Sequence, residues 1–304
     1  MSDHSRIVLI DGYGQIYRHF HAIPVLTNSR GEPVNALFGM ARFFLGLDEA
    51  LPNATHGALV LDAGRPARRL ELLPEYKANR PHMPDELRRQ LPLISEWAAA
   101  AGWPQLREEG READDLIAAV ALNCPGQQVA VISFDKDLAQ LVKPGEVEVL
   151  QPGPKGRLEP FGPAEIEAKF GVPPGAIGDF LALVGDTSDN IDGVPGVGPK
   201  TAAALLRQFG TLDALLANPD AVEKPALRET LRHQAGLLRR NRALVALDTR
   251  LPDGWTGWEG LRRRPADFTR LTAMAQEHGF RSLEGAIAKA HDRYRNQDLF
   301  SFMG

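Results

Sequence analysis

The sequence is poor in cysteine and has no long apolar run. Its one cysteine, Cys124, excludes an intramolecular disulfide and a cysteine-based zinc site. No segment approaches the roughly 18 apolar residues that span a bilayer, and the early apolar run at residues 7–10 is too short for a signal-peptide core. Low-complexity linkers and internal repeats are lacking too. We therefore expect a soluble, cytoplasmic, monomeric protein that does not contact a membrane.

A surplus of positive charge is also missing. The 35 Lys and Arg residues face 39 Asp and Glu residues, for a net charge of −4, which taken alone argues against nucleic acid as a partner. Basic residues nevertheless gather locally, and each gathering is either a solvated helix face or part of a phosphate-binding surface. The groups are Arg65, Arg68, Arg69, Lys77 and Arg80; Arg239, Arg240 and Arg242; and Arg262, Arg263 and Arg264.

The first 150 residues alternate short apolar runs with longer amphipathic segments. The runs at 7–10, 58–61, 129–132 and 147–150 have the length and composition of buried strands. Helical patterns lie between them at 36–50, 84–101 and 112–123. Strands that alternate with helices predict a mostly parallel sheet covered on both faces. The predicted fold class is α/β.

Strand patterns fade after residue 163, and helical patterns take over. They lie at 163–170, 176–184, 201–209, 212–216, 227–247 and 267–289. We expect three parts: an α/β core at 1–184, a helical domain at 185–290, and a C-terminal tail at 291–304.

Acidic residues follow several of the predicted strands. Asp11 and Asp62 each come directly after a strand, and Asp135 and Asp137 come just after another. The carboxyl ends of parallel strands meet at one edge of a sheet, where ligands gather. Other acidic residues open a helix or lie one turn apart after an apolar segment: Glu112, Asp114 and Asp115, then Asp186 and Asp189.

Each of these carboxylates, taken singly, has an ordinary structural explanation as a turn or a helix cap. As a set they would repel one another and destabilise the fold. Divalent cations would remove that repulsion, and oxygen ligands without a cysteine or histidine cluster indicate Mg²⁺ or Mn²⁺. Without the charge of these nine residues, the remaining net charge is +5 rather than −4.

Six segments resemble the bacterial 5′-nuclease family, which comprises the 5′–3′ exonuclease domain of DNA polymerase I and the related flap endonucleases. They occur in order between about residues 6 and 288: Ile-Asp-Gly (10–12), Glu-Tyr-Lys-Ala-Asn-Arg (75–80), Glu-Ala-Asp-Asp (112–115), Asp-Lys-Asp-Leu (135–138), Gly-Asp-Thr-Ser-Asp-Asn (185–190) and Gly-Val-Pro-Gly-Val-Gly-Pro-Lys-Thr-Ala (193–202). Because 304 residues are too few for a fused polymerase, we expect a stand-alone form.

The resemblance implies a PIN-like nuclease core and two Mg²⁺ sites, in which Mn²⁺ can substitute. The first site would use Asp11, Asp62, Glu112, Asp114 and Asp115, and the second Asp135, Asp137, Asp186 and Asp189. Two metals about 3.5–4 Å apart can hold the scissile phosphate and activate a water. Asp114 would lie near both metals, and we expect Asp114 and Asp137 to be indispensable for catalysis.

The resemblance also implies a helical arch above the metals, at about 65–95. Lys77 and Arg80 would lie there as catalytic cations that stabilise charge on the transferring phosphate. Tyr76 would either pack on a DNA base or anchor the arch, and anchoring is the role we favour. The chain departs from the family where relatives often have an aromatic–Arg–His run, because Arg68, Arg69 and Leu70 occupy that place.

Residues 193–202 resemble the helix–three-turn–helix element of the family. Its DNA-contacting residues would be Gly196, Gly198, Lys200 and Thr201, because glycines allow close backbone approach and a helix start presents free N–H groups to a phosphate. A potassium ion bound by backbone carbonyls is a further implied ligand. The rival interpretation is a P-loop, which we reject because Pro199 displaces the lysine by one position and the segment follows a helical stretch.

The predicted function is hydrolysis of DNA at 5′ ends and flaps, in primer removal during replication and in repair. The substrates would be flap, nicked or 5′-ended duplex DNA. Two alternatives remain: a ribonuclease on a similar acidic α/β core, and a DNA-binding relative that has lost catalysis.

The C-terminal tail suggests one more partner. Residues 296–300 resemble the short peptide by which bacterial proteins bind a sliding clamp, with Leu299 and Phe300 at its apolar positions. The alternative is that the terminal aromatic residues fold back onto the core of this chain.

Overall fold

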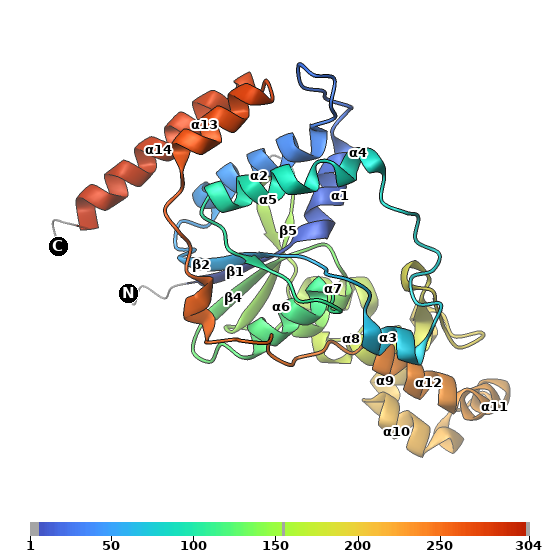
Figure 1. The fold of residues 1–304 in the computed structure, drawn as a ribbon. Helices are drawn as coiled ribbons and strands as arrows, with labels where there is room; N and C mark the ends of the chain where they lie inside the picture. The colour runs from blue at the N-terminus through green and yellow to red at the C-terminus, as the bar shows by residue number, and fades with distance from the viewer. Residues whose placement is uncertain (1–5, 154–155, 302–304) are drawn as a thin grey trace.

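A computed structural model describes residues 6–153 and 156–301, with side chains up to residue 295. Its centre is a six-stranded sheet in the order β3-β2-β1-β4-β5-β6 (Figure 1). All neighbouring strands are parallel except β6, which runs antiparallel to β5. The strands are β1 (Arg6–Asp11), β2 (His56–Val60), β3 (Gln105–Leu106), β4 (Gln128–Ile132), β5 (Val147–Pro152) and β6 (Leu158–Pro160).

The four predicted strands are confirmed as β1, β2, β4 and β5, and they form the middle of the sheet. Their side chains alternate between two hydrophobic cores. In β1, Ile7 and Leu9 belong to one core, and Val8 and Ile10 belong to the other. A strand buried on both faces has no polar face, which explains the uninterrupted apolar runs of the sequence.

Helices cover both faces of the sheet. On one face lie α1 (Gly12–Ala22), α2 (Asn35–Ala50) and α5 (Leu91–Ala100), whose apolar side chains meet Val8, Ile10 and Leu59. On the other face lie α6 (Ala113–Leu122) and α8 (Ile177–Val184), packed with Ile7 and Leu9. The predicted α/β fold with a mostly parallel sheet is therefore confirmed.

The helices of the second half agree with the predicted ranges, except that two long predictions are each two helices. These helices are α7 (Pro163–Phe170), α9 (Pro199–Phe209), α10 (Leu212–Ala217), α11 (Pro225–His233), α12 (Ala235–Val245), α13 (Phe268–Glu277) and α14 (Arg281–Ser301). The pattern at 227–247 is interrupted at Gln234 and the pattern at 267–289 at Gly279. Gly279 adopts a left-handed backbone with φ of 74°, which ends a helix.

The two groups of helices within 185–290 lie on different sides of the sheet. Helices α9 to α12 continue from α8, whereas α13 packs on α5 and α14 packs on α2 (Figure 1). The sequence pattern shows which residues are helical, but it does not show which face of the sheet each helix covers. The pattern therefore did not separate these two groups of helices. Helices α9 to α12 therefore form one group, and α13 and α14 form another.

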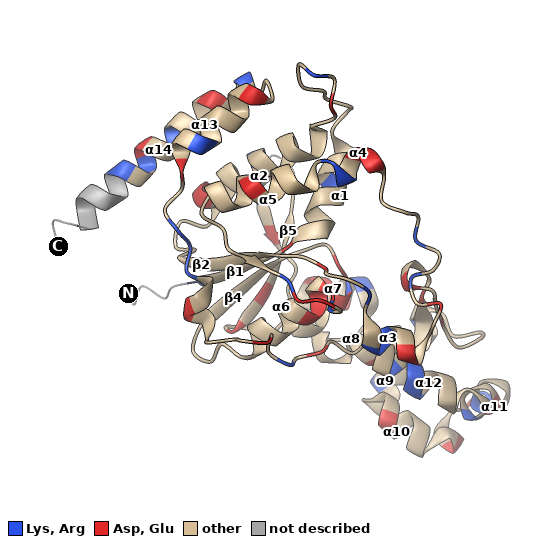
Figure 2. Ribbon diagram, in the orientation of Figure 1, with Lys and Arg blue, Asp and Glu red and all other residues tan. Residues whose placement is uncertain are grey.

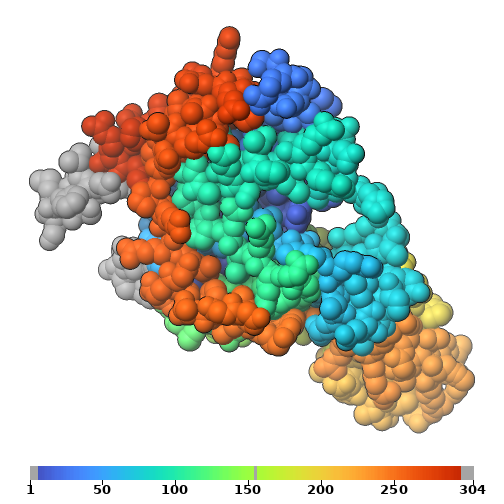
Figure 3. Space-filling view, viewed as in Figure 1, coloured from blue at the N-terminus to red at the C-terminus, as the bar shows by residue number. Residues whose placement is uncertain are grey.

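The arch segment differs from a continuous helix. It contains α3 (Ala67–Leu72), then turns and extended chain at 73–84, and then α4 (Asp85–Arg88). The predicted helix at 84–101 is also interrupted, because a new helix, α5, begins at Leu91 with Pro92 in its first turn. In the space-filling view the molecule is hollowed between this segment and the α/β core (Figure 3).

The backbone of the C-terminal segment continues helix α14 as far as Ser301. The side chains of Leu299 and Phe300 lie outside the described residues, and their contact with a clamp remains a prediction. In the part of the chain that the structure describes, no helix combines the length and apolarity needed to cross a bilayer.

Candidate functional site

The carboxyl edge of the sheet brings three predicted carboxylates to one cavity. Asp11 ends β1 and caps α1, where its carboxylate accepts hydrogen bonds from the Gly14 N–H at 3.1 Å and the Ser133 hydroxyl at 2.6 Å. Asp62 follows β2 and accepts from the Ala113 N–H at 2.6 Å. Both residues, together with Asp135, line a cavity of about 440 Å³.

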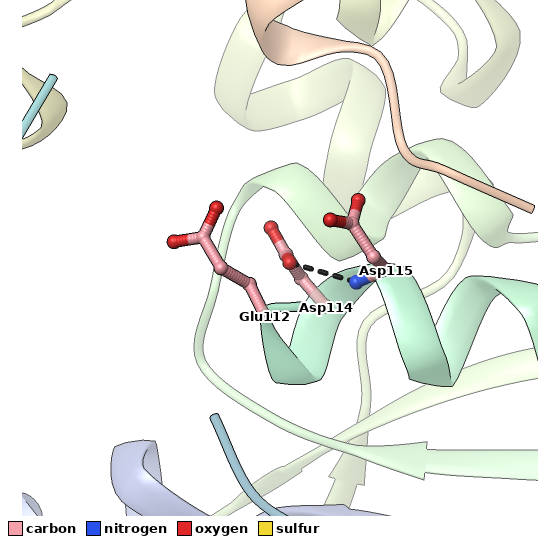
Figure 4. A group of neighbouring side chains, drawn as sticks. All are labelled: Glu112, Asp114 and Asp115. Atoms are coloured by element: carbon pink, nitrogen blue, oxygen red, sulfur yellow. Dashed lines mark hydrogen bonds between the residues drawn. The ribbon is translucent and has the colours of Figure 1, made fainter. Parts of the chain in front are cut away.

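The start of α6 adds a first group of three carboxylates (Figure 4). Oxygens of Glu112, Asp114 and Asp115 all lie within 4.8 Å of one another, a spacing that a metal ion could bridge. Glu112 and Asp114 line the cavity. Asp115 instead accepts hydrogen bonds from Arg69 at 2.6 and 2.9 Å and from the Asp248 N–H at 2.8 Å.

A second group consists of Asp137, Asp186 and Asp189, whose carboxylate oxygens also lie within 4.8 Å of one another. All three side chains are buried. One oxygen of Asp137 is buried without any hydrogen-bond partner, an arrangement that native proteins avoid unless a ligand satisfies the group. Lys136 lies 2.8 Å from Asp186 and compensates that carboxylate.

Burial in and around the cavity disfavours the ionised form of three of these carboxyls, Asp11, Asp114 and Asp137. Burial, reinforced by the charge of Asp135, raises the pKa of Asp11 to about 6. Burial also raises the pKa of Asp114 and Asp137 well above the usual range, and neighbouring carboxylates add to the shift. A divalent cation would reverse these shifts by favouring the ionised forms. Oxygen donors of this kind and the unpartnered Asp137 oxygen fit Mg²⁺ or Mn²⁺.

Arg69 is a buried cation beneath the first carboxylate group. Its guanidinium is 3% exposed and lies 2.5 Å from Glu112 and 2.6 Å from Asp115, with Asp114 at 3.6 Å. A planar guanidinium can serve two carboxylates at once. The sequence marked Arg69 as one of a basic group and as a departure from the family pattern. In the structure its side chain fixes the orientation of two predicted metal ligands.

Lys77 and Arg80 lie beside the carboxylates. Lys77 pairs with Glu112 and lies 3.7 Å from Asp189, and Arg80 pairs with Asp189. Both line the cavity. The two cations thus connect the first carboxylate group to the second.

The turn that carries Lys77 docks onto the loop that carries Asp189. Lys77 adopts a left-handed backbone with φ of 57°, and its N–H donates to the Asp189 carbonyl at 3.0 Å. Asn190, with φ of 59°, donates its side-chain amide to the Glu75 carbonyl at 2.8 Å. Tyr76 is 5% exposed and donates to Asp189 at 2.8 Å, a geometry that anchors the turn.

The predicted DNA-binding hairpin has an anchored interior and an open surface. Val194 and Val197 are buried in the core, whereas Gly196, Gly198 and Lys200 are exposed. Gly196 has φ of 78°, which a residue with a side chain rarely adopts. Gly198 is the N-cap of α9, and Thr201 lies in its first turn. Figure 2 shows further Lys and Arg residues on α9, α11 and α12.

The structure therefore gathers the predicted acidic residues around one edge but gives them different surroundings. Three supporting residues escaped the sequence reasoning: Arg69, Ser133 and Lys136. A sequence signal existed for two of them, because Lys136 lies between the predicted ligands Asp135 and Asp137 and Ser133 lies two residues before Asp135. Arg69 had no such signal, since it comes from a helix 43 residues away from Glu112.

Replacing Arg69 should destabilise the fold, because the buried carboxylates would then repel one another without a compensating cation. Arg69→Met leaves Glu112 and Asp115 buried without their cation, and we expect a loss of about 3–5 kcal/mol in the free energy of unfolding in EDTA. Saturating Mg²⁺ should recover part of this loss. Denaturant unfolding in both conditions measures it, with Arg68→Met as the control at the exposed neighbouring position. Equal losses in the two variants would contradict the role assigned to Arg69.

Comparison with known proteins identifies the family of this arrangement. Residues 6–171 match a family model described as the 5′–3′ exonuclease N-terminal resolvase-like domain. Residues 172–268 match a second model, the 5′–3′ exonuclease C-terminal SAM fold. The boundary between the two models falls after α7, at Gly171.

The relatives are bacterial. A 5′–3′ exonuclease of Aquifex aeolicus is 36% identical over 296 residues, which cover 97% of this chain and 99% of that protein. DNA polymerase I of Bacillus caldotenax is 38% identical over 282 residues, which cover 91% of this chain and 32% of the polymerase. The chain thus spans about a third of the length of that polymerase relative.

Solved structures share the fold. The bacteriophage T5 D15 flap endonuclease, in a complex with DNA and metal ions, superposes with a TM-score of 0.63 at 24% identity, covering 89% of this chain and 99% of that chain. The matched family models and the full-length similarity to the Aquifex exonuclease agree with the two carboxylate groups at the sheet edge. The chain belongs to the 5′–3′ exonuclease family.

Proposed function

We propose that this protein is a structure-specific 5′ nuclease that hydrolyses DNA phosphodiester bonds at 5′ ends and flaps, in primer removal and repair. The observation that carries the proposal is the pair of carboxylate groups bridged by Lys77, the first of which lines the cavity through Glu112 and Asp114. The T5 flap endonuclease complex, which contains DNA and metal ions, supports the same substrate class.

The residues that would hold two Mg²⁺ or Mn²⁺ ions are the nine acidic side chains. Asp11, Asp62, Glu112, Asp114 and Asp115 would serve the first ion, and Asp135, Asp137, Asp186 and Asp189 the second. Such ions stabilise charge on a scissile phosphate and lower the pKa of a bound water. Because Arg69 and the Asp248 N–H occupy Asp115, Asp115 would act through water or by orienting its neighbours.

Lys77 and Arg80 would neutralise the phosphate that enters the cavity. In the structure Lys77 and Arg80 pair with carboxylates. If metal ions bound those carboxylates, the two side chains would be free to pair with a substrate phosphate. A lysine ammonium and an arginine guanidinium held in place before the reaction stabilise developing negative charge without reorganising solvent. Their position at the cavity wall supports a catalytic role over a merely structural one.

The hairpin at 193–202 would hold the duplex away from the cut. Exposed Gly196 and Gly198 let a DNA backbone approach, the N–H groups at Lys200 and Thr201 open α9, and the Lys200 ammonium adds charge. A potassium ion on the backbone carbonyls of this element would strengthen the same contact.

Two other functions are less well supported. A non-catalytic DNA-binding relative would be expected to lack metal ligands, but this chain retains all nine acidic residues. A ribonuclease on a similar core would not need the hairpin or its exposed glycines. Cleavage of matched DNA and RNA flaps by the same preparation distinguishes these functions from the proposed one.

Removing a carboxylate from either group should abolish DNA cleavage and leave DNA binding intact. Asp114→Asn and Asp137→Asn should each reduce cleavage of a labelled flap substrate by several orders of magnitude in Mg²⁺. Flap-DNA affinity, measured in Ca²⁺, should stay within a few fold. Asp253→Asn, at an exposed acidic position, is the matched control and should cleave normally. Near-normal turnover by both site variants would refute the two-metal assignment.

We expect substitutions in the hairpin to weaken DNA binding and substitutions in the arch segment to slow cleavage. Lys200→Ala should weaken duplex binding for all sequences alike and reduce the salt slope by about one phosphate contact. Lys77→Ala should instead lower the single-turnover rate more than the affinity. If Lys77→Ala changed only affinity, Lys77 would be a binding residue rather than a catalytic one.

We further propose that Leu299 and Phe300 bind a bacterial sliding clamp, because their motif would keep the nuclease at replication sites. The full chain should bind the cognate clamp with a dissociation constant below about 100 µM. The double substitution Leu299→Ala/Phe300→Ala should abolish that binding and leave flap cleavage unchanged. Equal binding by both proteins would exclude this contact.

A further inference from the structure

The basic group Arg262, Arg263 and Arg264 has no part in the proposed nuclease site. It lies on the extended chain between η6 (Trp258–Leu261) and α13 (Figure 2). Arg262 and Arg263 line a cavity of about 500 Å³, and Arg264 is not part of its lining. We call this cavity the arginine cavity.

The arginine cavity lies at the edge of the sheet opposite the carboxylates. Ala54 and Thr55, which precede β2, line it, whereas Asp62 of the metal cavity follows β2. The five residues of β2 therefore separate the two cavities by about 17 Å along the strand. The remaining walls come from the end of α2, the loop after it and part of α14: Asp48, Leu51, Pro52, Ala290, Arg293 and Tyr294.

The two cavities carry opposite charge. Three arginines and one aspartate line the arginine cavity, which leaves a charge of +2. In the metal cavity two cations, Lys77 and Arg80, face five carboxylates: Asp11, Asp62, Glu112, Asp114 and Asp135. A cavity with a surplus of guanidinium charge attracts an anion rather than a metal ion.

Arg263 is the buried cation of the arginine cavity. Its side chain is 10% exposed and lies 2.7 Å from Asp48, and its guanidinium lies 4.1 Å above the Trp103 ring. Hydrogen bonds to the carbonyls of Ala54 at 3.3 Å and Ala101 at 3.4 Å fix its orientation. Its Nε is buried and has no hydrogen-bond partner among the described residues. A buried donor of this kind costs stability unless a ligand or a water satisfies it.

Arg262 and Arg293 are the cations that a ligand can reach. Arg262 is exposed, and in the part of the chain that the structure describes its guanidinium makes no hydrogen bond or ion pair. Arg293 lies 3.2 Å from Glu49, but these side chains are 40% and 76% exposed, and such a pair contributes little stability. Both guanidinium groups can therefore bind an anion without the loss of a strong interaction.

A phosphate monoester matches the charge of this cavity. It carries nearly two negative charges at neutral pH, and arginine binds phosphate through two parallel N–H···O bonds. The cavity volume lies within the range of about 300–1,000 Å³ that is typical of small-molecule sites, so the ligand extends beyond its phosphate. Leu51, Pro52 and Ala290 supply an apolar wall, together with Tyr294, whose ring packs edge-on against Phe268.

We propose that the arginine cavity binds the terminal phosphate of a nucleotide. Arg262 and Arg293 hold the phosphate, Arg263 holds the positive wall in place, and the sugar and base lie against Leu51 and Tyr294. The phosphate belongs to a free mononucleotide or to the phosphorylated end of a strand. The site is separate from the metal cavity, so it goes beyond the proposed nuclease function and does not rest on it.

The test is calorimetric titration of the full-length protein in EDTA, where no metal ion can bridge a phosphate to the carboxylates. The ligands are deoxyadenosine 5′-monophosphate and a 5′-phosphorylated tetranucleotide, each compared with its unphosphorylated form. We expect a dissociation constant below about 1 mM for a phosphorylated ligand, and no binding of deoxyadenosine. Arg262→Gln should weaken the phosphate-dependent binding about 10- to 100-fold, the range for loss of hydrogen bonds to a charged group.

The two phosphorylated ligands distinguish the sources of the phosphate. Weakening by Arg262→Gln for the monophosphate indicates a free nucleotide, and weakening for the tetranucleotide alone indicates the end of a strand. Arg293→Gln is an independent second variant and should weaken the same ligand. Arg264→Gln is the matched control, because Arg264 is an exposed neighbouring arginine outside the lining, and it should bind like the wild type.

Equal binding of phosphorylated and unphosphorylated ligands would overturn the site. Equal affinities of Arg262→Gln and Arg264→Gln would overturn it too, as would a wild-type protein that binds neither phosphorylated ligand. Flap cleavage in Mg²⁺ tests the nuclease proposal separately, and Arg262→Gln should cleave like the wild type. A wild-type protein that cleaves flaps but binds no nucleotide phosphate in EDTA refutes the arginine cavity alone.

Discussion

The mutual repulsion of carboxylates at one sheet edge is the constraint on which the rest of this structure depends. Parallel strands carry Asp11, Asp62 and Asp135 to the same edge, and burial there raises the pKa of Asp11 to about 6. Anions in such surroundings destabilise a fold unless cations compensate them. Arg69 supplies permanent compensation at Glu112 and Asp115, and Lys136 supplies it at Asp186. The remaining charge is what divalent ions would neutralise.

The same need to neutralise carboxylates joins the arch segment to the carboxylate groups at the sheet edge. The turn that carries Lys77 is held on the loop of Asp189 by backbone and side-chain hydrogen bonds. Its cations are paired with Glu112 and Asp189. Metal ions held by those carboxylates would free Lys77 and Arg80 to pair with a substrate phosphate. In this account, metal ions would compete with Lys77 and Arg80 for the carboxylates, and the substrate phosphate would compete with the carboxylates for Lys77 and Arg80.

The sequence predicted what depends on local pattern, and it missed what depends on three-dimensional neighbours. Apolar runs bounded by carboxylates were sufficient to place β1, β2 and β4 and the acidic edge. Strands β3 and β6, of two and three residues, are too short to show any periodicity. Arg69 looked like one surface arginine among several, because only the folded chain brings it beneath Glu112. The opposite placement of α9–α12 and α13–α14 was likewise invisible in helical patterns.

The central claim is that the sheet edge holds two divalent ions between the carboxylate groups and the substrate phosphate. The most direct measurement is a crystal of the protein with flap DNA and Mn²⁺, analysed by anomalous scattering. The account predicts two peaks about 3.5–4 Å apart, one beside Glu112 and Asp114 and the other beside Asp137 and Asp186. A single peak, or peaks away from both carboxylate groups, would contradict it.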